Sequence, residues 1–259
     1  MSEQVYLERD GAIATIVLNQ PERHNAMNAT MFGGIGRLLA ECDRDADLRC
    51  IIMRGAGGKA FSAGADISEF ETVRSSKKKA LEYGRMVHKA FHGFERCRHP
   101  IIAQIDGLCV GGGLGIAAAC DLRICGQSSR FGVPVKRLGL VEAHNEMGPL
   151  VRKFGPNVAL EILVVGEVFG VDDAVRMGIV NKVVPDGEVG AAARKMAESI
   201  AEGAPLSARW HKKFVYRLLD PTPLSVDEID EGFDCYDTED FQRGYKAFLA
   251  KQKPSFVGR

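Results

Sequence analysis

Two glycine-rich stretches constrain the fold of this chain more than any other feature, because each follows a strand-like run. The first is residues 62–67 (SAGADI), and the second is residues 111–115 (GGGLG), which open an apolar segment with helical spacing. A helix that begins on glycine presents unpaired N–H groups and the positive end of its dipole. Small residues also let a ligand approach the backbone. We therefore expect two backbone N–H groups that hold an oxyanion.

Short apolar runs alternate with helical segments through the first two-thirds of the chain. Asp10-Gly11 is typical of a type I′ hairpin turn between strands at 5–9 and 12–18. Further strands are predicted at 50–53, 101–105, 122–125 and 180–184, and helices at 31–42 and 83–97. The alternation predicts an α/β core.

After about residue 187 the pattern is helical only, with segments at 188–202, 205–219, 225–236 and 238–251. We therefore predict a core over residues 1–190 and a helical C-terminal region over 191–259, which packs on the core or, as an oligomerisation region, on another subunit.

The composition excludes several classes of function. The 34 basic and 34 acidic residues balance, so no overall field attracts nucleic acid or an anionic membrane surface. No apolar run approaches the roughly 18 residues of a membrane helix, and no charged-then-apolar leader precedes the first strand. The seven cysteines form no CxxC pair and lie mostly in apolar runs, which is typical of free thiols in a reducing compartment. The sequence thus predicts a cytoplasmic protein that binds neither nucleic acid nor membrane.

Three other motifs are poor matches. Residues 113–118 fit the dinucleotide pattern G-x-G-x-x-A, but residues 106–110 separate them from the preceding strand and no acidic residue follows about 20 positions on. Gly58-Lys59 lacks the first glycine and the Ser or Thr of a phosphate loop, and Ser62 lies one glycine short of a nucleophile elbow. The glycines could instead only permit close strand–helix packing, but two such runs, each after a strand, favour a site.

Four segments resemble the crotonase (enoyl-CoA hydratase/isomerase) superfamily, in order and across almost the whole chain. They are residues 19–27 (NQPERHNAM), 59–67 (KAFSAGADI), 111–122 with its GGG and CDL, and 247–254 (AFLAKQKP). The resemblance implies an α/β spiral of ββα units with a helical C-terminal trimerisation region, assembled as a homotrimer or a dimer of trimers. Because this fold supports many reactions, it leaves the chemistry open.

The resemblance also implies an acyl-CoA thioester as substrate, with coenzyme A part of the substrate and no metal or other cofactor. The N–H groups of Ala65 and Gly112 would hold the thioester carbonyl. The remaining residues implied in substrate binding are Arg23, Ala63, Gly64, Asp66, Ile67 and Gly111. Phe248 and Lys251 would lie near the adenine and phosphates of coenzyme A, either in the same subunit or in a neighbouring one. A solvated surface position is the alternative for Lys251.

Hydratases of this family position and activate water with two glutamates, and both are replaced in this chain. One falls two residues after the glycine triplet, at Gly115, and the other follows a proline, at Val135. A well-placed acid or base contributes roughly 10² to 10⁴ in rate. The sequence therefore predicts feeble hydration by the usual route unless other groups handle protons.

The loop at 140–148 supplies the candidate substitutes Glu142, His144 and Glu146. Dehalogenases of the family have a nucleophilic aspartate near the position of His144, and decarboxylases have a tyrosine near that of Glu142. Histidine titrates near neutral pH, and an apolar pocket raises the pKa of a glutamate. In the alternative interpretation these carboxylates pair with surface lysines and arginines. His88 and His92, at i and i+4, are predicted to lie on an exposed polar face rather than to bind metal.

Three functions remain open on the sequence. The first is an enzyme of enoyl-CoA hydratase/isomerase type that works through an enolate, as a lyase or an isomerase. The second is a decarboxylase of malonyl-type acyl-CoA, which needs enolate stabilisation but no paired glutamates. The third is a catalytically silent CoA-binding protein.

Overall fold

The computed structural model describes residues 3–259, and its largest sheet has six strands in the order β1-β2-β3-β5-β7-β9. β1 (Val5–Asp10) and β2 (Ile13–Leu18) form the predicted antiparallel hairpin. The turn lies one residue later than predicted, at Gly11 and Ala12, because Asp10 pairs with Ile13. Of these two residues only Gly11 has a positive φ, 57°, so the turn is not the predicted type I′. The other strands continue the sheet in parallel: β3 (Cys50–Gly55), β5 (Ile101–Ile105), β7 (Leu122–Gly126) and β9 (Lys182–Val184).

A second parallel sheet of three strands carries the predicted site loops. It contains β4 (Ala60–Ser62), β6 (Leu108–Val110) and β8 (Arg130–Gly132). These strands follow β3, β5 and β7 in the chain, and helices follow each pair. The repeated strand–strand–helix order confirms the predicted α/β spiral.

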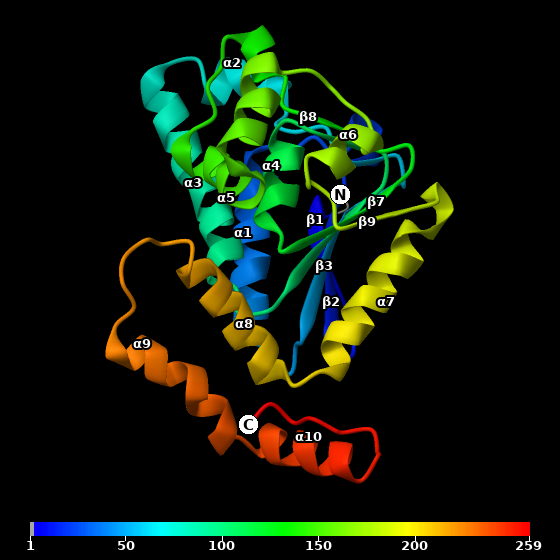
Figure 1. Ribbon diagram of the computed structural model, residues 1–259. Helices are drawn as coiled ribbons and strands as arrows, with labels where there is room; N and C mark the ends of the chain where they lie inside the picture. The colour runs from blue at the N-terminus through cyan, green and yellow to red at the C-terminus, as the bar shows by residue number, and fades with distance from the viewer. Residues whose placement is uncertain (1–2) are drawn as a thin grey trace.

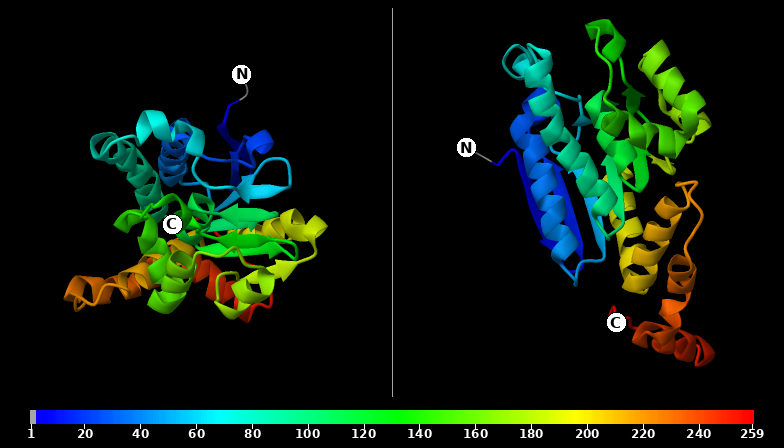
Figure 2. Two further views of the ribbon diagram at one scale, coloured as in Figure 1. Left: turned by 90° about the horizontal axis from the view of Figure 1, so that it is seen from above. Right: turned by 90° about the vertical axis from the view of Figure 1, so that its left-hand side faces the viewer.

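Helices cover both faces of the six-stranded sheet (Figure 1). α1 (Ala29–Arg44) and α3 (Lys77–Arg96) run side by side on one face (right view of Figure 2), and α7 (Val189–Glu202) covers the other. Along β3, Ile51 and Met53 join the core with α1 and α3, whereas Cys50 and Ile52 pack with α7. This alternation is the period of two of a strand buried on both sides. The boundary predicted after residue 190 falls within α7, which packs with the core.

The remaining helices are α2 (Phe70–Val73), α4 (Gly112–Ala119), α5 (His144–Leu160), α6 (Val171–Arg176), α8 (Pro205–Arg217), α9 (Val226–Asp230) and α10 (Glu239–Leu249). Short 3₁₀ helices lie at Pro21–Arg23, Ile67–Glu69, Val135–Leu138, Asp186–Glu188 and Glu231–Asp237, and a π-helical turn at Glu161–Val165.

The helices after α7 extend away from the sheet, as the orange and red segments of Figure 1 show. Asp121 anchors α8 to the core, because its carboxylate pairs with Lys212 Nζ at 2.8 Å and accepts from Tyr216 Oη at 2.7 Å. Farther out, Phe233 and Leu249 are 63% and 74% exposed, so this region leaves an apolar surface uncovered in a single chain.

The seven cysteines are free thiols, and six of them are buried. Burial raises the pKa of Cys50 and Cys120 to about 12, so these thiols are neutral and act as small apolar side chains. Across residues 3–259, we find no helix of the length and apolarity that a bilayer crossing requires.

Candidate functional site

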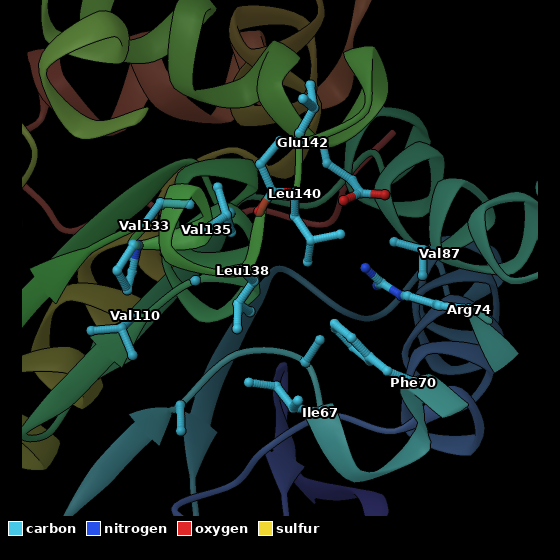
Figure 3. Close-up of a pocket in the computed structure, with 18 of the residues that line it drawn as sticks. Ile67, Phe70, Arg74, Val87, Val110, Val133, Val135, Leu138, Leu140 and Glu142 are labelled. Carbon is cyan, nitrogen blue, oxygen red and sulfur yellow. The ribbon is translucent and has the colours of Figure 1, made fainter. Parts of the chain in front are cut away.

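A pocket of about 120 Å³ lies where the chain leaves β4, β6 and β8. The structure brings both glycine-rich stretches to its wall. Figure 3 shows Ile67, Phe70 and Val87 on one side and Val110, Val133 and Leu138 on the other. The rest of its apolar lining includes Phe32, Phe91, Leu140 and Leu150.

Two backbone N–H groups on the pocket wall are without partners. Ala65 and Gly112 both line the pocket, and a Cβ on Gly112 would lie 3.6 Å from Ala65 N. Within residues 3–259, neither N–H donates a hydrogen bond. Gly112 is also the first residue of α4, where the positive end of the helix dipole favours negative charge. The two groups are thus near each other and free to donate to one oxygen atom.

Gly64 allows the two loops to approach. Its φ is +97°, and a Cβ there would lie 3.0 Å from Val110 O and 3.1 Å from Gly112 N. Ser62 Oγ accepts from Gly64 N at 3.1 Å and donates to the carbonyl of Asn25 at 2.8 Å. Asn25 is fully buried. The loop that presents Ala65 is therefore held by hydrogen bonds from inside the core.

Two carboxyl groups lie in the same pocket. Glu142 and Glu146 both line it, and the Glu146 side chain is only 16% exposed. Burial, followed by a hydrogen bond to Glu142 and the charge of Glu142, raises the pKa of Glu146 to about 8, against the opposing charge of Arg74. The pair therefore keeps a proton at neutral pH, so that one carboxyl can donate while the other accepts.

His88 lies beside this pair, contrary to the sequence prediction. Its Nε2 is 3.8 Å from Glu146 Oε1, and that nitrogen is buried without a hydrogen-bond partner among the residues described. Burial and the charge of His92 lower the pKa of His88. His92 is exposed as predicted, at 3.3 Å from Glu95. The prediction of an exposed face failed for His88 because α5 packs over that part of α3, a contact that helical spacing does not reveal.

His144 lies outside the pocket. It is the first residue of α5, it is exposed, and it is not among the lining residues. Gly115 and Val135 do line the pocket, so both positions at which the resemblance implies a replaced glutamate face it.

Arg74 is a pocket residue that sequence reasoning missed. It follows α2, lines the pocket, and extends its guanidinium into it (Figure 3). The guanidinium carbon lies 4.2 Å from the ring centroid of Tyr83 and 4.7 Å from that of Phe70. No motif marks this arginine, because its position depends on packing between α2 and α3.

Only some of the residues predicted to bind CoA line the pocket. Ala63, Ile67 and Gly111 line the pocket. Arg23 Nη1 lies 2.6 Å from Asp66 Oδ2, and hydrogen bonds from Ser68 are the largest cause of the lowered pKa of Asp66.

Phe248, at the end of α10, is 81% exposed, and Lys251 is exposed with a φ of 54°. Neither residue lines the pocket, and α10 lies at the opposite end of the molecule from α2 (Figure 1), so a single chain does not bring them to it. Over the described part of the chain, no group of three or more His, Cys, Asp or Glu side chains is placed to hold a metal ion.

Comparison with known proteins identifies the family. The sequence profile of the Enoyl-CoA hydratase/isomerase family matches residues 8–259. The chain belongs to this family. Members similar to it include the short-chain-enoyl-CoA hydratase of Clostridium acetobutylicum, 32% identical over 96% of this chain and 95% of that protein. The (E)-benzylidenesuccinyl-CoA hydratase of Thauera aromatica is 33% identical over 98% and 99%.

Solved structures of the enoyl-CoA hydratase/isomerase family have the same fold. An enoyl-CoA hydratase/carnithine racemase from Magnetospirillum magneticum superposes with a TM-score of 0.97 at 43% identity, covering 100% of this chain and 97% of the other. A putative family protein from Hyphomonas neptunium gives a TM-score of 0.94 at 35% identity, over 99% and 98%. The predicted superfamily and fold class are therefore confirmed.

Proposed function

We propose that this chain is an acyl-CoA-processing enzyme of enoyl-CoA hydratase/isomerase type that works through a thioester enolate. The N–H groups of Ala65 and Gly112 hold the enolate oxygen, and the Glu142–Glu146 pair moves the protons. One observation carries the proposal: two neighbouring carboxyl groups, Glu142 and Glu146, share an apolar pocket with two unpaired N–H groups. Membership of the family supports the CoA thioester as substrate.

The two halves of the site have separate tasks in this scheme. As negative charge develops on the thioester oxygen, each N–H that faces it contributes about 10² to 10³ in rate. A carboxylate takes a proton from water or from carbon, and the protonated carboxyl gives one to the carbon next to the thioester, for a further factor of roughly 10² to 10⁴. Water addition and a double-bond shift both pass through this enolate. Glu142 and Glu146 thus replace the carboxylates missing at Gly115 and Val135.

His144 has no part in this scheme, because it lies outside the pocket. The reaction needs no metal and no cofactor other than the coenzyme A of the substrate. Phe248 and Lys251 contact the CoA nucleotide of a neighbouring subunit in a homotrimer or a dimer of trimers, with Arg23 and the 63–67 backbone nearer the pocket. The exposed apolar surface of the C-terminal helices supports such an assembly.

Decarboxylation of a malonyl-type acyl-CoA is the second candidate. It is favoured by Arg74, a cation in the pocket that could hold a substrate carboxylate before it leaves as carbon dioxide. The enolate left behind would use the same two N–H groups, and protonated Glu146 would supply the proton.

The test is a mass-spectrometric survey of the purified protein with crotonyl-CoA, longer and aromatic enoyl-CoAs, and malonyl-type CoAs. Added water, or a double-bond shift seen by chromatography, supports the proposal. Loss of carbon dioxide supports the second candidate instead. Binding of these thioesters with no conversion in any of them would favour a silent CoA-binding protein.

A further inference from the structure

We propose that Arg74 forms a subsite for a carboxylate on the acyl group, so that the preferred substrates are CoA thioesters of dicarboxylic acids. This inference rests on the proposed function, because it names the class of acyl group that the same pocket takes. It comes from one feature of the pocket: a guanidinium that is held in place, faces the cavity, and forms no ion pair with a carboxylate of residues 3–259.

The guanidinium of Arg74 is positioned by aromatic rings rather than by acids. Its central carbon lies over the rings of Phe70 and Tyr83, at 4.7 and 4.2 Å from their centroids. Stacking of this kind orients the plane of a guanidinium. Burial raises the pKa of Tyr83, and a side-chain hydrogen bond between Arg74 and Tyr83, which acts to lower that pKa, uses only part of the guanidinium donors. Tyr83 is itself buried, so the ring on which the guanidinium lies is fixed by packing. Arg74 is thus prepared for a ligand before one arrives.

The donors of Arg74 are incompletely used. Its Nε is buried and has no hydrogen-bond partner within the described chain. Among residues 3–259, no carboxylate oxygen lies within 4.0 Å of a guanidinium nitrogen of Arg74, the distance at which the two would form an ion pair. Leaving a buried donor of a charged group unsatisfied costs free energy. A bound carboxylate would accept from the planar guanidinium in the paired geometry that arginine favours.

The Glu142–Glu146 pair does not take this role. Glu146 keeps its proton because burial and the Glu142 carboxyl raise its pKa. A substrate carboxylate at Arg74 would raise that pKa further, since like charge disfavours ionisation. The bound anion would therefore keep Glu146 in the protonated form that delivers a proton to the enolate. The rest of the lining is mostly apolar (Figure 3), so Arg74 is the group that distinguishes an acidic acyl chain from a neutral one.

The alternative is that Arg74 only balances the charge of the glutamate pair. The two roles differ in what they do to ligands. A carboxylate subsite gives selectivity between ligands of one shape, whereas a counter-ion affects neutral and acidic acyl groups equally.

The experiment measures binding of two saturated thioesters that the proposed reaction does not convert. Glutaryl-CoA carries a terminal carboxylate. In 5-methylhexanoyl-CoA an isopropyl group takes its place, so that two methyl groups stand where glutaryl-CoA has its two carboxylate oxygens. Titration calorimetry with the full chain gives the dissociation constants for the wild type, Arg74→Met, Arg74→Lys and the control Arg85→Met. Arg85 is exposed and outside the pocket.

The wild type is expected to bind glutaryl-CoA about tenfold to a hundredfold more tightly than 5-methylhexanoyl-CoA, as a charge-assisted pair implies. Arg74→Met should abolish this preference, Arg74→Lys should keep part of it, and Arg85→Met should leave it unchanged. Melting temperatures show whether each variant is folded, and the wild-type preference needs no variant at all. Equal binding of the two thioesters by the wild type overturns the subsite but leaves the proposed function standing. Failure to bind any CoA thioester overturns both.

Discussion

Replacing Glu146 with glutamine should change how the stability of the protein depends on pH. The pKa of Glu146 is raised from 4.5 to about 8 by burial and by Glu142. Between these two values the folded state keeps a proton that the unfolded chain has lost, so folding stability falls as pH rises. Each pH unit in this interval is worth about 1.4 kcal/mol for one proton. From pH 5.5 to 7.5 the wild type should therefore lose about 2.5 kcal/mol relative to Glu146→Gln.

The assay is thermal unfolding of both proteins at fixed protein concentration over that pH range. For a domain of this size, about 2.5 kcal/mol corresponds to a change of about 5 °C or more in the difference between the two melting temperatures. Glu82→Gln, at an exposed position outside the pocket, is the matched control. A constant difference between wild type and Glu146→Gln across the range would refute the reasoning, because Glu146 would then ionise alike in both states.

Three further predictions concern the site and its support. Gly112→Val should lower kcat by about 10² to 10³ with little change in melting temperature, because the valine side chain fills the space beside the two free N–H groups of Ala65 and Gly112. Gly113→Ala should instead destabilise the fold, since its Cβ would lie 2.5 Å from the carbonyl oxygen of Ser62 in β4. Glu142→Gln should lower kcat by roughly 10² to 10⁴, and His144→Ala should leave it unchanged, both measured on the best substrate of the survey. Asp121→Ala should lower the free energy of unfolding by about 3 kcal/mol in urea titration, because it leaves a buried lysine unpaired.

Each of these predictions has an outcome that contradicts it. Full activity in Gly112→Val would show that the N–H of Gly112 does not bind the enolate oxygen. Equal melting temperatures for the Gly112 and Gly113 variants would show that the close contacts of Gly113 do not limit packing. Loss of activity in His144→Ala would return that residue to the site. An unchanged urea midpoint in Asp121→Ala would mean that α8 is anchored elsewhere.

The order of strands and helices could be predicted because it depends on local periodicity. The strands of the first hairpin and β3, β5 and β7 have clear apolar runs, and glycine and proline mark breaks between the helices after residue 187. The predicted hairpin turn itself lies one residue too early. The strands β4, β6 and β8 could not be predicted, because they are three residues long and are defined by pairing with one another rather than by composition.

The site divides in the same way. Ala65 and Gly112 lie in glycine-rich motifs, so the sequence located them. Among the three loop candidates, the sequence could not separate Glu142 and Glu146 from His144, because the direction of each side chain depends on how α5 packs against α3. Arg74 and His88 carry no motif at all. They join the site only through tertiary contacts, because Arg74 and His88 lie more than 50 residues before Glu142 and Glu146 in the chain.

The central claim is that this chain stabilises a thioester enolate and moves protons with the Glu142–Glu146 pair. Its most direct test is deuterium uptake at the carbon next to the thioester carbonyl of butyryl-CoA in D₂O, followed by mass spectrometry. The account predicts exchange by the wild type and by His144→Ala, and strongly reduced exchange by Gly112→Val, Glu142→Gln and Glu146→Gln. Exchange at the wild-type rate in both glutamate variants would contradict it, because the protons would then be carried by other groups.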